Sequence, residues 1–247
     1  MYSGIIHLTP MATFLLILAS MQISFLAVSL YLHRGQTHGA ISFHPLLSHF
    51  FRLWLWLTTA GLVTKQWVAV HRKHHAKCDT EDDPHSPQVH GIGKLLTQGT
   101  LLYRRAARDK DMVKMYGLGV KEDWLDRTLY VKHPFIGAPL FLLVNIVLFG
   151  FATGPLVWLC QVITVPFWAS GFVNGLAHYV GYRNNVTRDA SRNLFPLGVF
   201  LCGEELHNNH HARPGSAKLS QKWWELDMGW VAIRLFSMVG LIKINRI

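Results

Sequence analysis

Residues 10–32 read PMATFLLILASMQISFLAVSLYL, and residues 33–38, directly after them, read HRGQTH. The first stretch contains no charged side chain, and as an α-helix rising about 1.5 Å per residue it would be roughly 35 Å long. That length is enough to cross the roughly 30 Å hydrocarbon layer of a bilayer. The sequence therefore predicts a membrane span that ends directly at a pair of histidines, His33 and His38.

Three further apolar stretches follow. Residues 134–152 and 155–178 each reach spanning length, and the Gly154-Pro155 pair between them is typical of a tight turn, so they predict a helical hairpin. Residues 46–63 barely reach that length. If 46–63 crossed the bilayer, the histidines before it and after it would lie on opposite faces and could share no site. We therefore predict three spans, with 46–63 a peripheral or re-entrant helix.

These stretches predict an all-α fold, an integral membrane helical bundle with a histidine-rich cap. One membrane domain would cover residues 1–247, with its cap formed by 64–132 and 179–247. No cleavable signal peptide is expected, because the first apolar stretch is too long and no basic segment precedes it. The three cysteines are far apart in the sequence and are expected as small apolar fillers: Cys78, Cys160 and Cys202.

The charge distribution agrees with a membrane protein. Half of the residues are apolar and 15% are charged, against roughly 25% charged residues in soluble proteins. A net charge of +10 is compatible with nucleic-acid binding, but all 24 Lys and Arg lie in residues 34–132 or 183–246. Separating charge from apolar stretches follows the positive-inside rule and has no role in a nucleic-acid binder. We expect the basic segments on the cytoplasmic side and no nucleic-acid partner.

Histidines recur in three short patterns, and their arrangement is more informative than their number. HRGQTH at 33–38 has the spacing HxxxxH, whereas HRKHH at 71–75 and HNNHH at 207–211 both have the spacing HxxHH. On a helix, positions i, i+3 and i+4 lie on one face, so each HxxHH pattern presents three imidazoles to one region. Isolated histidines are expected to be ordinary interfacial or core residues: His7, His49, His90 and His133.

Eight imidazoles brought together without a metal would leave buried lone pairs unsatisfied. Eight also exceed the six positions of an octahedral ion, so at least two metal ions are expected. Chemistry alone does not choose the element, because imidazole suits Zn, Cu, Fe and Ni.

The three patterns resemble the integral-membrane fatty acid desaturases, including stearoyl-CoA and acyl-lipid delta-9 desaturases of the bacterial type. The resemblance extends from His33 to about Leu226, and it includes Asp83-Pro84-His85 after the second pattern. Asn174-Gly-Leu-Ala-His178 is similar to the NxxxH element of that family. The resemblance implies that Asn174 holds a metal-bound water. It implies the following metal ligands: His33, His38, His71, His74, His75, His178, His207, His210 and His211.

The resemblance implies a cytoplasmic di-iron centre, with two Fe ions, that uses O2 and two electrons to introduce a cis double bond into an acyl chain, with delta-9 the favoured position. Thr64, Trp67 and Trp168 are candidates for the lining of an acyl tunnel. Animal acyl-CoA enzymes carry Arg-Asp before the second pattern, whereas this chain has Ala69-Val70. That departure favours an acyl chain on a phospholipid over acyl-CoA. Glu204-Glu205-Leu206 precedes the third pattern, where relatives often have Gly and Trp.

The electron donor is expected to be a separate protein, such as a ferredoxin with its reductase, because no iron–sulfur CxxC pattern or GxGxxG fingerprint is visible. A bacterial inner membrane is the expected location, with the histidine patterns cytoplasmic. Two alternatives remain: a fatty acid hydroxylase or alkene-forming decarboxylase on the same scaffold, and a metal transporter or sensor. The transporter is disfavoured because spans 10–32 and 134–152 contain essentially no polar side chain besides Gln22 and Asn145.

Overall fold

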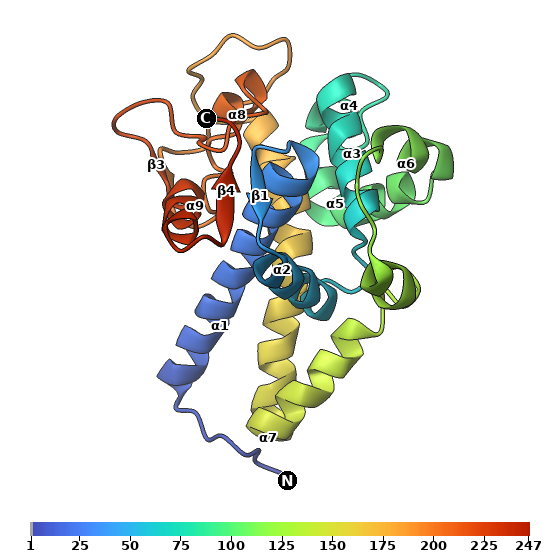
Figure 1. Cartoon of the computed structure of the whole chain (residues 1–247), viewed down its shortest axis with the longest axis vertical. Coiled ribbons are helices and arrows are strands. Elements are labelled where there is room, and N and C mark those ends of the chain that lie inside the picture. Colours follow the sequence, from blue (N-terminus) through green and yellow to red (C-terminus); the bar gives the residue numbers. More distant parts are fainter. Residues whose placement is uncertain (1) are drawn as a thin grey trace.

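The computed structural model describes residues 2–247, apart from the side chain of Ser170, and these residues are mostly helical (Figure 1). Long helices form the lower part of the view, and shorter helices with irregular segments form a cap above them. The expectation of a helical fold with clustered histidines is confirmed. The placement in a membrane, the single-domain boundaries and the cytoplasmic side remain predictions.

The first long helix is α1 (Pro10–Leu26), which continues directly into a π-helical segment, η1 (Ala27–Thr37). Thr9 caps its start by accepting a hydrogen bond from the Ala12 N–H, and Pro10 occupies the first turn, where no amide hydrogen is needed. The combined helix Pro10–Thr37 is long and apolar enough to cross a membrane. It delivers the first histidine pattern to the base of the cap.

The second long apolar segment, Gly137–His178, also meets the length and composition expected of a membrane span. It comprises α7 (Gly137–Val165), the π-helical η3 (Pro166–Val173) and the short 3₁₀ segment η4 (Leu176–His178). α7 is not straight. The Trp158 indole N–H donates to the Ala138 carbonyl at 2.8 Å, although residues 20 apart would lie about 30 Å apart in a straight helix. The two halves of α7 are therefore antiparallel, as Figure 1 shows.

The reversal occurs at Gly150, where φ is 79° and ψ is 177°, a backbone conformation open essentially only to glycine. The predicted turn at Gly154-Pro155 is therefore wrong by a few residues. Gly154 lies inside the second half, where a Cβ would be 2.6 Å from the Asn145 carbonyl oxygen. Pro155 is tolerated because it falls near the start of that half, where its missing amide hydrogen costs little. The hairpin itself follows the prediction.

The cap is assembled from short helices. They are α2 (Pro45–Thr58), α3 (Thr64–Lys77), α4 (Pro87–His90), α5 (Ile92–Ala107), α6 (Lys110–Tyr116), the π-helical η2 (Asp126–Tyr130), α8 (His207–Ala212) and α9 (Met228–Met238). The stretch 46–63 is thus a helix only to Thr58, and a turn with Ala60 at φ 41° leads into α3. α2 packs against η1 and α7.

Two short sheets, which the sequence did not predict, tie distant parts of the chain together. β1 (Ile41–Phe43) pairs antiparallel with β4 (Ile242–Ile244), and β2 (Leu197–Gly198) pairs parallel with β3 (Leu226–Asp227). The first sheet joins the segment after HRGQTH to the end of the chain. Both sheets therefore fix the surroundings of the first and third histidine patterns.

Arg34 anchors η1 within the cap. Its guanidinium is 1% exposed and donates to both oxygens of Asp227, at 2.9 and 3.1 Å, and to the Cys202 and Ala217 carbonyls at 2.8 Å. A buried guanidinium is stable only when paired and hydrogen-bonded in this way. Asp227 also caps α9 by accepting from the Trp230 N–H, so one ion pair links η1, α9 and the loop before α8.

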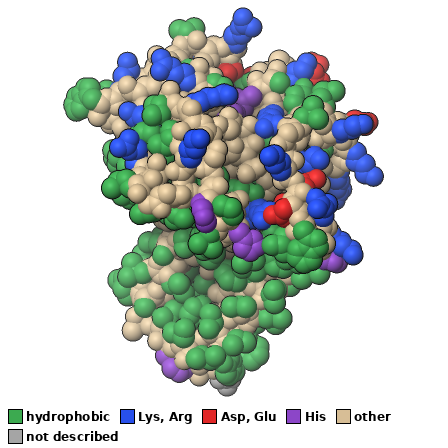
Figure 2. All heavy atoms as spheres, in the orientation of Figure 1, with side chains coloured by type: hydrophobic (Ala, Val, Ile, Leu, Met, Phe, Trp, Pro, Cys, Tyr) green, Lys and Arg blue, Asp and Glu red, His purple; other side chains and the backbone are tan. Residues whose placement is uncertain are grey.

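Polar and apolar surfaces are separated along the long axis of the molecule. Hydrophobic side chains cover the lower part of Figure 2, whereas Lys and Arg side chains lie on the upper part. The exposed apolar residues of α7 include Leu143, Val147, Leu156 and Leu159. An exposed apolar belt of this kind is the surface expected to face lipid.

Candidate metal centre

The π-helical form of η1 explains the HxxxxH spacing. The His38 N–H donates to the His33 carbonyl at 3.2 Å, five residues back, so five residues complete about one turn. On an ordinary α-helix, residues five apart point about 140° away from each other. The wider turn places both imidazoles on the same side of the chain.

The two HxxHH patterns lie on helices, α3 and α8, and each of them is divided between two groups of histidines. From α3, His71 and His75 enter one group and His74 the other. From α8, His210 enters the first group and His207 with His211 the second. Each helix therefore gives its i and i+4 side chains to one group and its i+3 side chain to the other.

The first group, the five-histidine group, has ring nitrogens that all lie within 4.8 Å of one another. Its members are His33, His38, His71, His75 and His210. The Nε2 atom of His210 is 2.9 Å from those of both His33 and His75, and the Nε2 atoms of His71 and His75 are 3.0 Å apart. Five imidazole nitrogens that could bind a metal ion therefore lie close together.

The second group, the four-histidine group, adjoins the first. Its members are His74, His178, His207 and His211. The His207 Nε2 atom is 3.1 Å from the Nε2 atoms of both His178 and His211. The His75 and His211 rings stack with their centroids 4.4 Å apart, so the two groups are in contact. All nine predicted histidines are brought together.

Four of these histidines have a carboxylate at the other ring nitrogen. The Nδ1 atoms of the four lie 2.8–3.1 Å from carboxylate oxygens, in the pairs His33–Glu204, His74–Asp83, His178–Asp79 and His211–Asp189. In the last three pairs the carboxylate accepts the Nδ1 hydrogen and leaves Nε2 with a free lone pair, as it does for histidines that bind metals.

None of these four carboxylates was expected from the sequence to orient a histidine. Two of them are close to the histidine patterns in sequence. Asp83 begins the Asp-Pro-His segment after the second pattern, and Glu204 lies three residues before HNNHH. Asp79 and Asp189 lie in irregular segments without a spacing that would have singled them out.

Metal ions would satisfy the imidazole nitrogens of these groups better than hydrogen bonds between the histidines do. His178 and His211 give their Nδ1 hydrogens to carboxylates, so both Nε2 atoms are acceptors that face His207, which has at most one hydrogen to offer there. In the five-histidine group, the buried Nε2 atom of His38 has no hydrogen-bond partner in the part of the chain that the structure describes. One cation at the centre of each group would satisfy these lone pairs, and neutral imidazole suits iron.

Protonation of the histidines would not satisfy these lone pairs, because the imidazoles favour the neutral form. Burial lowers the pKa of six of these imidazoles well below the ordinary value, and the neighbouring histidines lower it further. They are His38, His71, His75, His207, His210 and His211. Burial alone would raise the pKa of the Glu204 carboxyl, but His33 and Arg34 beside it keep that pKa below its ordinary value.

Cys78, expected as an apolar filler, lies against the four-histidine group, with its sulfur 3.8 Å from the His74 Nε2 atom. Burial and the adjacent Asp79 raise the pKa of its thiol, which keeps the sulfur protonated. Its sulfur lies within ligand distance of the four-histidine group, and a cation bound there would displace the thiol proton.

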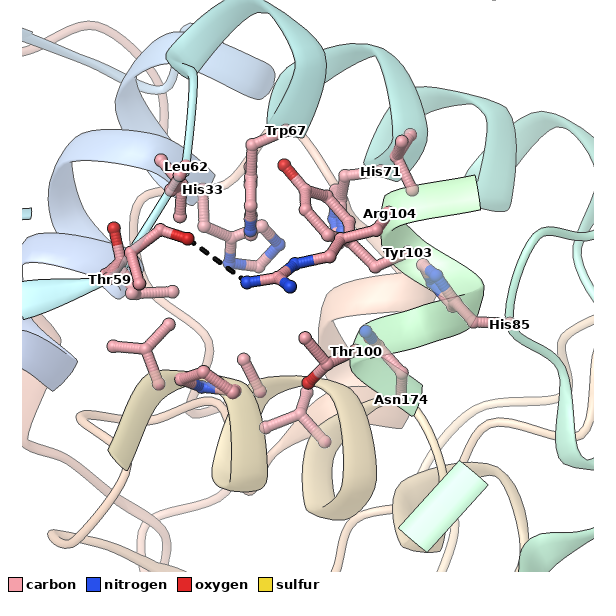
Figure 3. Close-up of a pocket in the computed structure, with 18 of the residues that line it drawn as sticks. His33, Thr59, Leu62, Trp67, His71, His85, Thr100, Tyr103, Arg104 and Asn174 are labelled. Atoms are coloured by element: carbon pink, nitrogen blue, oxygen red, sulfur yellow. Dashed lines mark hydrogen bonds between the residues drawn. The ribbon is translucent and has the colours of Figure 1, made fainter. Parts of the chain in front are cut away.

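A mostly apolar cavity of about 900 Å³, counted with its open mouth, borders the histidine groups (Figure 3). His33 and His71 form part of its wall, beside Trp67 from α3 and Ala169 from η3. Trp67 stacks on His71, with ring centroids 5.0 Å apart and planes 9° apart. The part that compares with an enclosed cavity is about 100 Å³, which gives room for a short apolar segment against the five-histidine group.

The expected tunnel residues and Asn174 are located as follows. Trp67 and Asn174 line this cavity. Trp168 lines a smaller cavity that shares Val28 and Ala169 with it. Thr64 lines a different cavity, beside Tyr31 and Arg52. The role of each as a tunnel or ligand residue remains a prediction.

The cavity also contains polar residues that the sequence analysis did not single out for it. His85, Tyr103 and Arg104 all line it, and the Arg104 guanidinium donates to the Ala60 carbonyl at 3.1 Å across it (Figure 3). Arg104 lies in the last turn of α5. It is exposed, but it also lies across the cavity from the turn after α2.

The model of the family described as fatty acid desaturase matches residues 8–237. A delta-9 desaturase-like 4 protein of Arabidopsis thaliana is 33% identical, over 81% of this chain and 69% of the relative. An sn-1 stearoyl-lipid 9-desaturase of Synechocystis is 30% identical, over 96% of this chain and 76% of the relative. An acyl-CoA 5-desaturase, AL21, of Anemone leveillei is 32% identical, over 85% and 64% respectively.

Proposed function

The chain belongs to the fatty acid desaturase family and is an oxidoreductase, and from that premise we propose a specific reaction. The protein introduces a cis double bond, at the delta-9 position, into an acyl chain carried on a phospholipid. It uses two iron ions, O2, two protons from solvent and two electrons from a separate protein such as a ferredoxin with its reductase. The products are the unsaturated chain and two water molecules.

One observation carries this proposal: two adjoining groups of imidazoles, five and four in number, lie at the wall of an apolar cavity. Two iron ions bound there would supply the oxidising chemistry that removes two hydrogens from adjacent methylenes. The nine histidines would hold the ions. Glu204, Asp79, Asp83 and Asp189 would orient four of the rings by accepting their Nδ1 hydrogens.

The cavity walls have the task of positioning the acyl chain and excluding water. Trp67 is stacked on His71, so its indole would press a methylene chain against the five-histidine group. Val28, Val165 and Ala169 supply apolar wall on the side of the long helices.

The carrier is proposed from the residues before the second histidine pattern. Ala69 and Val70 are buried at 0% and 1% exposure, packed beside Ala107 and Met112, so neither offers a charge to a headgroup. The relatives differ in the acyl carrier that their names state: the Synechocystis protein is named for a stearoyl-lipid and the Anemone protein for acyl-CoA. We favour the phospholipid.

The proposed location is a bacterial inner membrane, with three spans and the histidine groups on the cytoplasmic side. Two apolar helical segments support this, the second of which folds back at Gly150. The separation of basic and apolar surfaces supports it as well (Figure 2).

The test is expression of the chain in a host with a compatible electron donor, followed by mass spectrometry of intact lipids and of free acyl chains. A new double bond that appears first in phospholipid, at carbon 9, is the expected product. A hydroxylated chain or a terminal alkene would replace the proposal with a hydroxylase or a decarboxylase. Appearance of the double bond first in acyl-CoA would overturn the carrier.

A matched pair of histidine variants tests the metal centre in the same host. His210→Ala removes a member of the five-histidine group, and we expect no product and at most one iron ion per chain. His49→Ala removes a histidine of α2 outside both groups and should leave product and iron content unchanged. Wild-type turnover by the His210 variant would remove that residue from the ligand set.

A further inference from the structure

His85 is a buried histidine that belongs to neither histidine group. Its residue is 2% exposed, and its Nε2 atom has no hydrogen-bond partner among the described residues. A buried polar nitrogen without a partner costs free energy unless a water or a ligand satisfies it.

The surrounding contacts hold the His85 ring in one orientation. Its backbone N–H donates to Asp83 at 3.0 Å, and the same carboxylate accepts from the His74 Nδ1 atom. The His85 and His74 rings pack with centroids 4.6 Å apart and planes 35° apart. His85 is therefore fixed against a member of the four-histidine group.

His85 shares one side of the cavity with Asn174. Both residues line the cavity, on the side opposite Thr59 and Leu62 (Figure 3). Asn174 lies at the end of η3, four residues before His178, which is another member of the four-histidine group. The side-chain amide of Asn174 makes no hydrogen bond among the described residues. This polar end of the cavity thus borders the group that has four imidazoles rather than five.

We propose that His85 is a positioning residue which, together with Asn174, holds a water molecule at this end of the cavity, beside the four-histidine group. A buried water requires two to four polar partners, and the His85 Nε2 atom supplies one that Asn174 alone cannot. The relevance of this water to desaturation rests on the proposed function, because it would lie next to the ion with fewer protein ligands.

Two variants separate hydrogen bonding from packing. His85→Phe keeps an aromatic ring against His74 but removes Nε2, whereas His85→Gln keeps a polar group that can reach the water. Both are compared with wild type for iron per chain and for double bonds formed per O2 consumed. We expect iron content to be unchanged in all of them. In His85→Phe, double bonds per O2 should fall about three- to tenfold, the effect of one lost hydrogen bond, and His85→Gln should recover most of that loss.

His90→Phe is the matched control, because His90 ends α4 and lies outside the cavity and both groups. It should behave as wild type. An unchanged ratio of double bonds to O2 in His85→Phe would overturn the proposal, since packing alone would then suffice. Loss of iron in His85→Phe would also overturn it, because His85 would then support the ligands directly.

A second readout does not depend on turnover. A high-resolution map of metal-free wild-type protein should show a water within about 3 Å of both the His85 Nε2 atom and the Asn174 amide, and the map of His85→Phe should lack it. A dry site in the wild-type map sinks the inference. Wild-type protein that shows this water but forms no double bond would instead overturn the proposed function and leave the role of His85 intact.

Discussion

Asp83 links a histidine of the four-histidine group to the backbone of its own loop. It accepts from His74 Nδ1 at 3.0 and 3.1 Å and from the backbone N–H groups of Asp79 and His85. Burial would raise the pKa of this carboxyl, but the hydrogen bond from His74 lowers it to about 2. Asp83 is therefore ionised at neutral pH and holds the His74 ring with Nε2 toward the four-histidine group.

Replacing Asp83 with Asn should weaken iron binding about 10- to 100-fold, the usual effect of removing a carboxylate behind a metal-binding histidine. Competition with a chelator measures the change. The matched control is Asp82→Asn, because Asp82 is exposed and lies 3.4 Å from the Lys77 ammonium, away from the histidines. Equal affinities in the two variants would contradict the role given to Asp83.

Residue spacing in the sequence indicated eight of the nine histidines, and the family resemblance added His178, but neither indicated how the nine divide. The i, i+3, i+4 rule places His71, His74 and His75 on one helical face. The structure then assigns His74 to a different group from its neighbours, because α8 faces α3 and approaches His74 with His207 and His211. That division depends on the relative position of two helices 130 residues apart, which no local pattern contains.

Among the elements, the reversal of α7 depends most clearly on a single residue. Gly150 has φ 79° and ψ 177°, and a Cβ there would be 2.5 Å from the Ser3 carbonyl carbon. Gly150→Ala should lower the free energy of unfolding by at least about 1–3 kcal/mol, the cost of forcing a side chain into this conformation. Thermal unfolding in detergent should show a lower Tm.

Gly93→Ala is the matched control for that substitution. Gly93 lies in α5, and a Cβ there would meet nothing within 4 Å. Alanine is the better helix former, so the Tm should stay the same or rise. A Gly150→Ala protein as stable as wild type would mean that the chain does not reverse at Gly150.

Element boundaries were less predictable than element types. Both Gly150 and Gly154-Pro155 are good turn candidates, and contact with the segment around Ser3 favours the former. The π-helical turns of η1 and η3 have no local sequence signal. They were recognisable only afterwards, from the five-residue hydrogen bonds His38 to His33 and Asn174 to Ala169. The short sheets were missed because two or three residues show no alternation.

For the whole molecule, the second and third histidine patterns must lie on the same side of any membrane that the chain crosses, since they share both groups. Epitope tags inserted after Gly119 and after the fully exposed Val186 should be accessible from one side in sealed vesicles. A tag at the N-terminus should be accessible only from the other. Labelling of the two loop tags from opposite sides would contradict the three-span topology.

The overall plan could be predicted because apolar length and charge segregation are properties of long segments, over which individual errors average out. The cavity could not, because its walls come from η1, α3, α5, α7 and η3, several of which are distant in sequence. Thr64 shows the limit of local reasoning. It precedes Trp67 by one helical turn, but it lines a different cavity beside Tyr31 and Arg52.

The two histidine groups differ in more than number. Among the described residues, one of five imidazoles in the first group has a carboxylate behind it, His33, whereas three of four do in the second. A carboxylate makes imidazole a stronger electron donor and favours the more oxidised ion. Iron in the two positions should therefore give two separate Mössbauer quadrupole doublets of equal area. In half-reduced protein, the ferric signal should come from the ion in the four-histidine group. The first electron should therefore reduce the ion in the five-histidine group.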